Sequence, residues 1–397
     1  MIENNRDDCN EDNTEEAELG QLPIDNNTKP ICYHPWVGLE ITPQGDFRPC
    51  CKFSESLGKS FEEYENSEKL KLLKEQFSNN QRPEGCNRCW RDEDAGLPSK
   101  RQIDWKYRFN ETEPSLENIQ VLSLSFGNSC NLACRTCNSY SSSGWIPESR
   151  KLSKQIPDLV IHGHKKFYKD MKFMEKIKSL KHVKHVEFPG GEPFLTGTKE
   201  HLDYLDVLIS MDPSQIELRY ITNATIMPGS EFWERWQRFK KVDIQLSIDG
   251  TEEKFEYLRH LAKWEEVDKN IDQYLKSSTV LKNISISVSH TVSLMNVFYV
   301  PEFVLWCLEK KLGKPYIGLV STPSMYSIRA LPNNIKDTIR KKLDRFDFNE
   351  IVSDMYEEDL SDHFDQSLNY INSLDQQRNQ KFSDTFSEFY QLLEVKN

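Results

Sequence analysis

The sequence contains no long apolar run, and this absence argues against a membrane-spanning segment. No stretch of about 18 consecutive apolar residues occurs in the chain. The first residues also lack the apolar core of a secretory signal, which favours the cytoplasm as the location of the protein. At 397 residues, of which 37% are hydrophobic, the chain is long enough for one large domain and a smaller one.

The sequence also has fewer basic than acidic residues, 51 against 63. The net charge is −12, and residues 1–28 alone hold nine acidic residues against one Arg. This composition predicts a disordered acidic tail over residues 1–28, with a net charge of −8, followed by a nearly balanced chain. Because the sequence shows no strong basic patch, nucleic acid is not favoured as a partner.

Cysteine, in contrast, is abundant, with ten residues. In a long chain without a secretion signal, clustered cysteines favour metal binding over disulfides. Seven of the ten fall into two groups with a spacing typical of metal ligands: Cys130, Cys134 and Cys137 in one group, and Cys32, Cys50, Cys86 and Cys89 in the other.

The first group has the spacing Cys-x3-Cys-x2-Cys and directly follows the apolar run of residues 121–126. Three thiolates on one tight loop suit a four-iron cluster in which one iron has no protein ligand. Such an iron can bind a substrate or a cofactor. We therefore expect this loop, residues 130–137 and called the cysteine loop below, to be a reactive centre.

The second group begins with an expected hairpin. Residues 37–42 alternate between apolar and polar and predict a strand, and residues 43–46 predict a turn. The hairpin would bring Cys32 close to Cys50. The neighbouring Cys51 is expected to be a spare, buried thiol rather than a ligand.

A helix is expected over about residues 60–77, and the pair Cys86-x2-Cys89 follows it. Together with the two hairpin cysteines, this pair supplies four thiolates. Four thiolates fit either a structural zinc ion or an iron–sulfur cluster, and the spacing does not separate the two.

Apolar, β-rich segments alternate with helical patterns in the centre of the chain. Strands are expected at about residues 119–126, 185–188, 216–221, 242–248, 284–289 and 316–320. Helices are expected at about residues 165–180, 198–210, 230–240, 252–276 and 299–311. Six β/α repeats predict an α/β fold with a parallel sheet, which right-handed crossovers would curl into a partial (β/α)6 TIM-type barrel. Functional loops should gather at the carboxyl ends of its strands.

The expected organisation has four parts. They are the tail at 1–28, a Cys-rich hairpin and helix module at 29–110, the α/β core at 111–332, and a helical segment at 333–397. Helical patterns in the last part, at about residues 334–346 and 364–395, are expected to pack on the barrel or cap its mouth, without chemistry of their own.

Candidate ligand-binding motifs follow three of the expected strands. Glycine lets a backbone approach a ligand closely, and the fork-shaped guanidinium of arginine suits a carboxylate. The motif residues are Gly190, Gly191, Glu192 and Pro193 after the second strand, Asn223 after the third, Ser247 and Asp249 at the end of the fourth, and Arg259 ten residues later.

The cysteine spacing and these motifs, in this order on successive strands, resemble those of radical S-adenosylmethionine (SAM) enzymes. The resemblance covers about residues 30–330. It implies that Cys130, Cys134 and Cys137 hold a [4Fe-4S] cluster whose open iron binds SAM. It further implies that the Gly-Gly-Glu-Pro motif binds the SAM amino group, that Arg259 pairs with the SAM carboxylate or ribose, and that the other motif residues help to hold this cofactor.

Two positions depart from the family pattern. Thr136 stands where relatives usually carry an aromatic residue beside the adenine, and Ala224 replaces the usual glycine after the third strand. Asn296, after the fifth expected strand, matches an asparagine of relatives.

The N-terminal hairpin resembles the twitch (half-SPASM) auxiliary-cluster module of the same superfamily. Cys32, twelve residues, Gly45, four residues and Cys50 fit its pattern, and the pair at Cys86 and Cys89 completes the ligand set. The resemblance implies a second, auxiliary [4Fe-4S] cluster. The order is unusual, because such modules usually follow the barrel.

The function that this resemblance implies is reductive cleavage of SAM to a 5′-deoxyadenosyl radical, which abstracts hydrogen from a substrate. The substrate would be a small molecule to be oxidised or a peptide to be modified, with the auxiliary cluster as electron acceptor and a reductase or flavodoxin-type protein as electron donor. Lone histidines such as His34 and His290 are expected to be structural, and no catalytic residue is identified. The alternative is a non-enzymatic zinc protein that uses the same cysteines.

Overall fold

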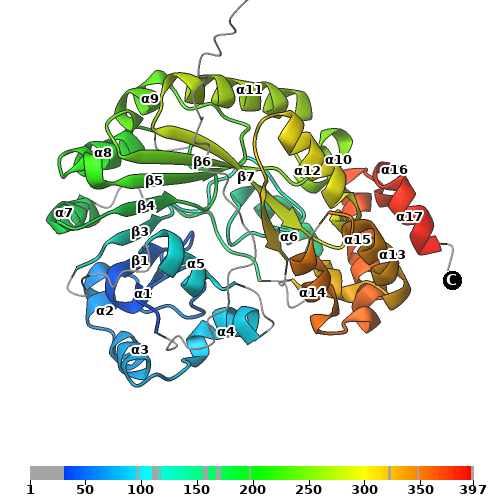
Figure 1. Cartoon of the computed structure of the whole chain (residues 1–397), viewed down its shortest axis with the longest axis horizontal. Helices are drawn as coiled ribbons and strands as arrows, with labels where there is room; N and C mark the ends of the chain where they lie inside the picture. The colour runs from blue at the N-terminus through cyan, green and yellow to red at the C-terminus, as the bar shows by residue number, and fades with distance from the viewer. Residues whose placement is uncertain are drawn as a thin grey trace, which may run out of the picture.

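The computed structural model describes residues 31–94, 98–109, 115, 118–154, 160–166, 171–195, 198–320, 323–346 and 348–394. The acidic tail expected at residues 1–28 lies outside them. The described strands form one eight-stranded sheet in the order β2-β1-β3-β4-β5-β6-β7-β8 (Figure 1). Since β2 and β8 are its two edges, the sheet is open, as a partial barrel requires.

All strands except β2 run parallel to their neighbours, and β2 pairs antiparallel with β1. The strands are β1 (Gly38–Ile41), β2 (Phe47–Arg48), β3 (Val121–Leu124), β4 (His185–Phe188), β5 (Glu217–Thr222), β6 (Lys241–Ser247), β7 (Ile284–Val292) and β8 (Tyr316–Leu319). The six expected central strands are thus confirmed as β3 to β8, and the α/β fold with them.

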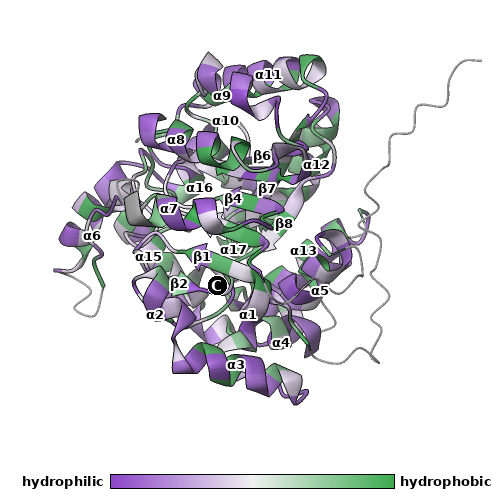
Figure 2. Ribbon diagram, turned by 90° about the vertical axis from the view of Figure 1, so that its left-hand side faces the viewer, coloured by the Kyte–Doolittle hydropathy of each residue, from purple (hydrophilic) through white to green (hydrophobic). Residues whose placement is uncertain are grey.

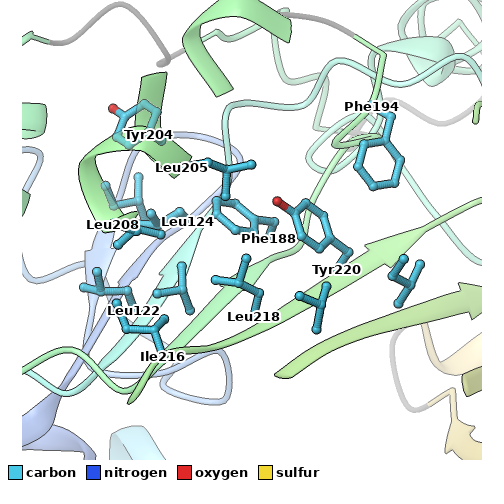
Figure 3. Packing of buried hydrophobic residues seen from close by; sticks show 14 of the residues in the cluster. Leu122, Leu124, Phe188, Phe194, Tyr204, Leu205, Leu208, Ile216, Leu218 and Tyr220 are labelled. Atoms are coloured by element: carbon cyan, nitrogen blue, oxygen red, sulfur yellow. The ribbon is translucent and has the colours of Figure 1, made fainter. Parts of the chain in front are cut away.

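Helices cover the outer face of this sheet. Those of the core are α6 (Ile146–Leu152), α7 (Met171–Ser179), α8 (Thr198–Ile209), α9 (Ser230–Trp236), α10 (Glu252–Leu258), α11 (Trp264–Val280) and α12 (Val300–Glu309). Figure 3 shows Phe188, Leu218 and Tyr220 of the strands beside Leu205 and Leu208 of α8. Figure 2 shows hydrophilic residues on outer turns of α8, α9 and α11, as expected for helices that bury one face.

The single helix expected over residues 252–276 is wrong. The chain leaves the helix after α10 at Leu258 and re-enters one at Trp264, and Leu261 between them has a φ of 79°. Periodicity missed the break because apolar residues continue through it. The break matters for the site, since it places Arg259 at the end of α10.

The expected hairpin exists, and it is part of the main sheet. Its strand β1 lies parallel to β3, with Leu39 opposite Leu122. The hairpin turn therefore lies at the same sheet edge as the cysteine loop, where Gln44 Nε2 donates to the Tyr140 carbonyl at 2.7 Å. This pairing was not expected from the sequence.

Further helices complete the N-terminal part: α1 (His34–Val37), α2 (Phe61–Glu65), α3 (Glu68–Ser78), α4 (Asn87–Asp94) and α5 (Lys100–Tyr107). The helix expected over 60–77 is therefore two helices, and Ser67 caps the second by accepting a hydrogen bond from the Leu70 amide. Ser caps favour a new helix start, which explains the break. The domain boundaries themselves stay predictions.

The C-terminal segment is helical and packs on the far side of the barrel from α8 and α9 (Figure 1). Its helices are α13 (Asn333–Leu343), α14 (Asn349–Glu357), α15 (Phe364–Arg378), α16 (Phe382–Thr385) and α17 (Ser387–Glu394). They share a hydrophobic core with the end of β7 and with α12. None of the described helices has the length and apolar character needed to cross a lipid bilayer.

Candidate active site at the carboxyl edge of the sheet

The cysteine loop begins six residues after the end of β3. Its three thiols are partly buried. Asn223 Nδ2, from the loop after β5, donates to Cys130 Sγ at 3.8 Å, and Arg259 Nη1 donates to Cys134 Sγ at 3.8 Å. The structure thus brings together residues that are up to 129 positions apart in the sequence.

Burial raises the pKa of all three thiols, and neighbouring thiols add to the effect at Cys134 and Cys137. For Cys134 the pKa rises to about 12, although Arg259 opposes the shift. Iron binds the thiolate form, so loading a cluster would release protons here. Three partly buried thiols on one loop, with hydrogen-bond donors beside two of them, fit the [4Fe-4S] ligand set.

Two glycines bring the loop after β4 against the cysteine loop. Gly190 and Gly191 have φ values of 78° and 54°, which favour glycine. A Cβ at Gly191 would lie 2.4 Å from the carbonyl oxygen of Ser129, the residue before Cys130. Glycine is therefore required here because the two loops pack backbone to backbone. The same lack of side chains would let a ligand approach the backbone closely.

Glu192 is 3% exposed and holds the loops after β4 and β5 together. Its Oε1 accepts hydrogen bonds from Thr222 Oγ1 at 2.8 Å and the Phe194 amide at 3.2 Å, and its Oε2 accepts one from the Asn223 amide at 2.7 Å. A carboxylate offers about four lone-pair sites, so one remains for a ligand amine. Pro193 is buried beside it, and its carbonyl oxygen lies 3.3 Å from His201 Nδ1.

The ends of β6 and β7 position Arg259. Asp249 Oδ2 lies 2.9 Å from Arg259 Nε, and Asp249 Oδ1 accepts from the Thr291 amide at 2.8 Å. Asn296 Nδ2 donates to the Asp249 carbonyl at 3.0 Å, which gives this expected site residue a positioning role. Ser247, the last residue of β6, is half-buried at the same edge.

Ala224 has a φ of 61°, in the left-handed region that favours glycine. Its amide donates to Thr222 Oγ1 and its carbonyl accepts from Asn270 Nδ2, so hydrogen bonds fix the strained turn. These hydrogen bonds thus hold Ala224 in a backbone conformation that favours glycine.

The second cysteine group also comes together. Cys32, Cys50, Cys86 and Cys89 line one hollow. Its wall further contains Lys52, Lys100, Arg101, His34, Phe53, Phe77 and Trp90. Three cations beside four thiols would compensate thiolate charge, and this donor set fits a thiolate-bound cluster.

Cys51 corrects one expectation. It is an exposed residue and is absent from the wall of the hollow, so it is not the buried thiol expected from the sequence. Cys50 and Cys51 lie in the turn that follows β2, where only Cys50 faces the hollow. His34 and His290 are buried, and their rings pair with Asp104 and the Ile248 carbonyl, respectively.

A row of polar side chains on the inner face of the sheet was not expected from the sequence. Register places Glu187 opposite Arg219, and Arg219 opposite Asp243. Asp243 Oδ1 accepts from Ser285 Oγ and Ser287 Oγ at 3.2 and 3.0 Å. The signal was the alternation of these residues with the buried apolar residues that face the helices.

The burial of Glu192 predicts a specific pH dependence. Burial raises its pKa from 4.5 to about 7, against the opposing effect of its three hydrogen-bond donors. The stability that this carboxyl contributes is present in full below about pH 4.5 and is lost as the pH rises through about 7. Between these values the free energy of unfolding of the SAM-free protein should fall by up to about 1.4 kcal/mol per pH unit.

Thermal midpoints of the wild type and of Glu192→Gln, measured from pH 5 to 8, would check this. We expect the wild-type midpoint to fall relative to that of the variant as the pH rises. A constant difference between the two would show that Glu192 titrates at its ordinary pKa.

One family model and several solved structures are similar to parts of this chain. Residues 124–300 match the family model described as the radical SAM superfamily. Among solved structures, the chain is similar to native anSMEcpe with bound AdoMet, at 18% identity and a TM-score of 0.43, over 59% of this chain and 62% of that one. It is also similar to Streptococcus suis SuiB bound to S-adenosylmethionine, at 11% identity and a TM-score of 0.37, over 79% and 68% of the two chains.

The similarity thus spans less than two thirds of anSMEcpe, and likeness this distant says nothing of the substrate. No curated protein matches the chain.

Proposed function

We propose that residues 124–300, which match the radical SAM family model, are the catalytic domain of an enzyme that cleaves SAM reductively and removes a hydrogen atom from a polar substrate. A bound [4Fe-4S] cluster would supply the one-electron reduction of SAM, which gives methionine and a 5′-deoxyadenosyl radical. The protein binds and orients SAM and keeps water from it.

The observation that carries this proposal is the convergence of Asn223 and Arg259 on the thiols of Cys130 and Cys134. Asn223 directly follows β5 and Arg259 ends α10, and the two reach different cysteines of one loop. A zinc site has no need of an arginine at a ligand thiol, whereas a site for SAM needs a cation for its carboxylate. Arginine has five N–H donors, and Arg259 uses only some of them on Asp249 and Cys134.

Glu192 is the proposed partner of the SAM amino group. Its spare lone-pair site lies among the loops that carry Gly191 and Asn223. An amine at this position would favour the ionised carboxylate and so lower the raised pKa. The carboxylate and the arginine would thus hold the two polar ends of the methionine part of SAM.

The cysteine hollow is proposed to hold the auxiliary [4Fe-4S] cluster, bound by Cys32, Cys50, Cys86 and Cys89, as electron acceptor. Zinc needs its donors about 2.0–2.3 Å from one point. Among the residues that the structure describes, no three His, Cys, Asp or Glu side chains converge closely enough for a single ion. Four thiols around a hollow suit a larger, multi-iron group better than one zinc ion.

The substrate is proposed to bind at the polar inner face of the sheet. Arg219 of β5 lies four residues before Asn223, about 13 Å along the strand direction, and therefore deeper in the barrel than the residues proposed to hold SAM. Arg219 and Asp243, paired at 3.5 Å, retain exposed side-chain fractions of 37% and 23%. They suit a polar small molecule or a peptide. A reductase or flavodoxin-type donor and a cytoplasmic location complete the proposal.

Anaerobic reconstitution of the full chain tests the proposed function. We expect a brown protein with about eight irons per chain that forms 5′-deoxyadenosine from SAM when dithionite is added. A colourless protein that binds one or two zinc ions, and that leaves SAM intact, would contradict the proposal and support the zinc alternative.

A further inference from the structure

We propose that helix α15 of the C-terminal segment supports the SAM site, because its residues Asp375 and Arg378 position the cysteine loop. No chemistry was expected from this segment on the basis of the sequence. The inference rests on the proposed function only where SAM is concerned.

Asp375 makes the first of two contacts. Arg135, which follows Cys134, is 1% exposed, and its Nη2 donates to Asp375 Oδ1 at 2.5 Å. Tyr257 OH donates to the same oxygen at 2.8 Å, and the Phe382 amide donates to Oδ2 at 2.6 Å. Asp375 therefore joins the cysteine loop to α10 with one buried carboxylate.

The guanidinium of Arg135 has further partners on α10. Its centre lies 3.5 Å from the ring centroid of Tyr257, and its Nε donates to the Tyr257 carbonyl at 3.0 Å. The Arg135 amide donates to the Leu258 carbonyl at 2.7 Å. Arg259, which reaches the Cys134 thiol, is the next residue. Through Arg135 and Tyr257, Asp375 therefore supports the backbone next to Cys134 and next to Arg259, the arginine that contacts the Cys134 thiol.

Arg378, one turn further along α15, makes the second contact. Its Nη2 donates to the Ala133 carbonyl at 2.8 Å and to Glu148 Oε2 at 2.6 Å. Its guanidinium lies 4.9 Å from the ring centroid of Trp145, whose Nε1 donates to the Cys134 carbonyl at 2.8 Å. Figure 1 shows α15 beside α6, the helix that carries Glu148.

The carbonyls of two successive loop residues, Ala133 and Cys134, are therefore fixed from α15, one directly and one through Trp145. Charges are buried in a protein only at a cost, and a buried Arg135 that loses Asp375 would be left with the neutral Gln380 as its side-chain acceptor. We expect the loop to rearrange rather than keep that charge unpaired. The Cys134 thiol and Arg259 would then lose their relative geometry.

Asp375→Asn in the full chain tests the inference, with Asp354→Asn as the matched control. Asp354 is also 6% exposed and also belongs to the C-terminal segment. Its Oδ1 accepts a hydrogen bond from Arg329 Nε at 3.2 Å, away from the cysteine loop. Hydrogen–deuterium exchange of the protein as purified, without SAM, is the first readout. We expect at least about tenfold faster exchange of amides in residues 130–137 in Asp375→Asn, and wild-type rates in Asp354→Asn.

The second readout is the affinity of the reconstituted protein for SAM, together with the change that SAM causes in the electron paramagnetic resonance spectrum of the reduced cluster. Asp375→Asn should bind SAM at least about tenfold more weakly and show an altered spectral change, and Asp354→Asn should match the wild type. Arg378→Lys, which keeps the charge and loses the fork, should show a smaller loss and serves if Asp375→Asn does not fold.

Equal exchange of the loop in Asp375→Asn, Arg378→Lys and Asp354→Asn would overturn the inference. A wild type whose loop depends on Asp375 but whose cluster does not respond to SAM would contradict the proposed function alone. The two failures are therefore distinguishable.

Discussion

Cys134→Ala should abolish SAM cleavage. Cys134 is the thiol that Arg259 contacts, and its carbonyl is held by Trp145. With two thiolates left, the loop cannot hold the four-iron group, so iron should fall by about four atoms per chain. Formation of 5′-deoxyadenosine with dithionite should drop by roughly a thousandfold or more, a larger loss than removal of an outer-shell partner usually gives.

Cys307→Ala is the control for this substitution. Cys307 is a fully buried thiol in α12, where it packs in the hydrophobic core. Its loss should lower the thermal midpoint without changing iron content or the yield of 5′-deoxyadenosine. A Cys134→Ala protein that keeps the wild-type iron content and rate would refute the assignment of the cysteine loop.

The strands and the local motifs were predictable because their signal is short in range. Alternation of residues such as Leu218, Arg219 and Tyr220 predicts a strand with one buried face, and the structure confirms it. The cysteine loop and the Gly-Gly-Glu-Pro motif are each contiguous in sequence. Their place after successive strands then follows from the geometry of a parallel sheet, whose carboxyl ends share one edge.

The structural features that were not predicted depend on contacts between distant residues, which produce no periodic pattern in the sequence. The pairing of Arg135 with Asp375 joins residues 240 positions apart, and neither residue stands out from other charged residues. At the break after α10, the backbone pairs with a segment far away in the sequence, since the Ala133 and Arg135 amides donate to the His260 and Leu258 carbonyls. Likewise, the four-residue strand β1 joins the main sheet through β3, which its own pattern cannot indicate.

Cys86→Ala should separate the two proposed clusters. Cys86 is one of the four thiols that line the hollow. Its pKa is raised mainly by burial and, to a smaller extent, by the neighbouring Cys50. Without it, iron should fall from about eight to about four atoms per chain. Cleavage of SAM with dithionite should persist, because the cysteine loop has no ligand in common with the hollow. Conversion of a substrate that must lose an electron after hydrogen abstraction should fall by about a hundredfold or more.

Cys51→Ser is the matched control, since Cys51 neighbours Cys50 in sequence and yet lies outside the hollow. It should keep the wild-type iron content. If Cys51→Ser loses iron as Cys86→Ala does, the ligand set includes Cys51, and the hollow rearranges on loading. If Cys86→Ala keeps all of its iron, the hollow holds no cluster. If that variant instead loses one zinc ion, the hollow is a structural metal site, and the electron released by the substrate must leave by another route.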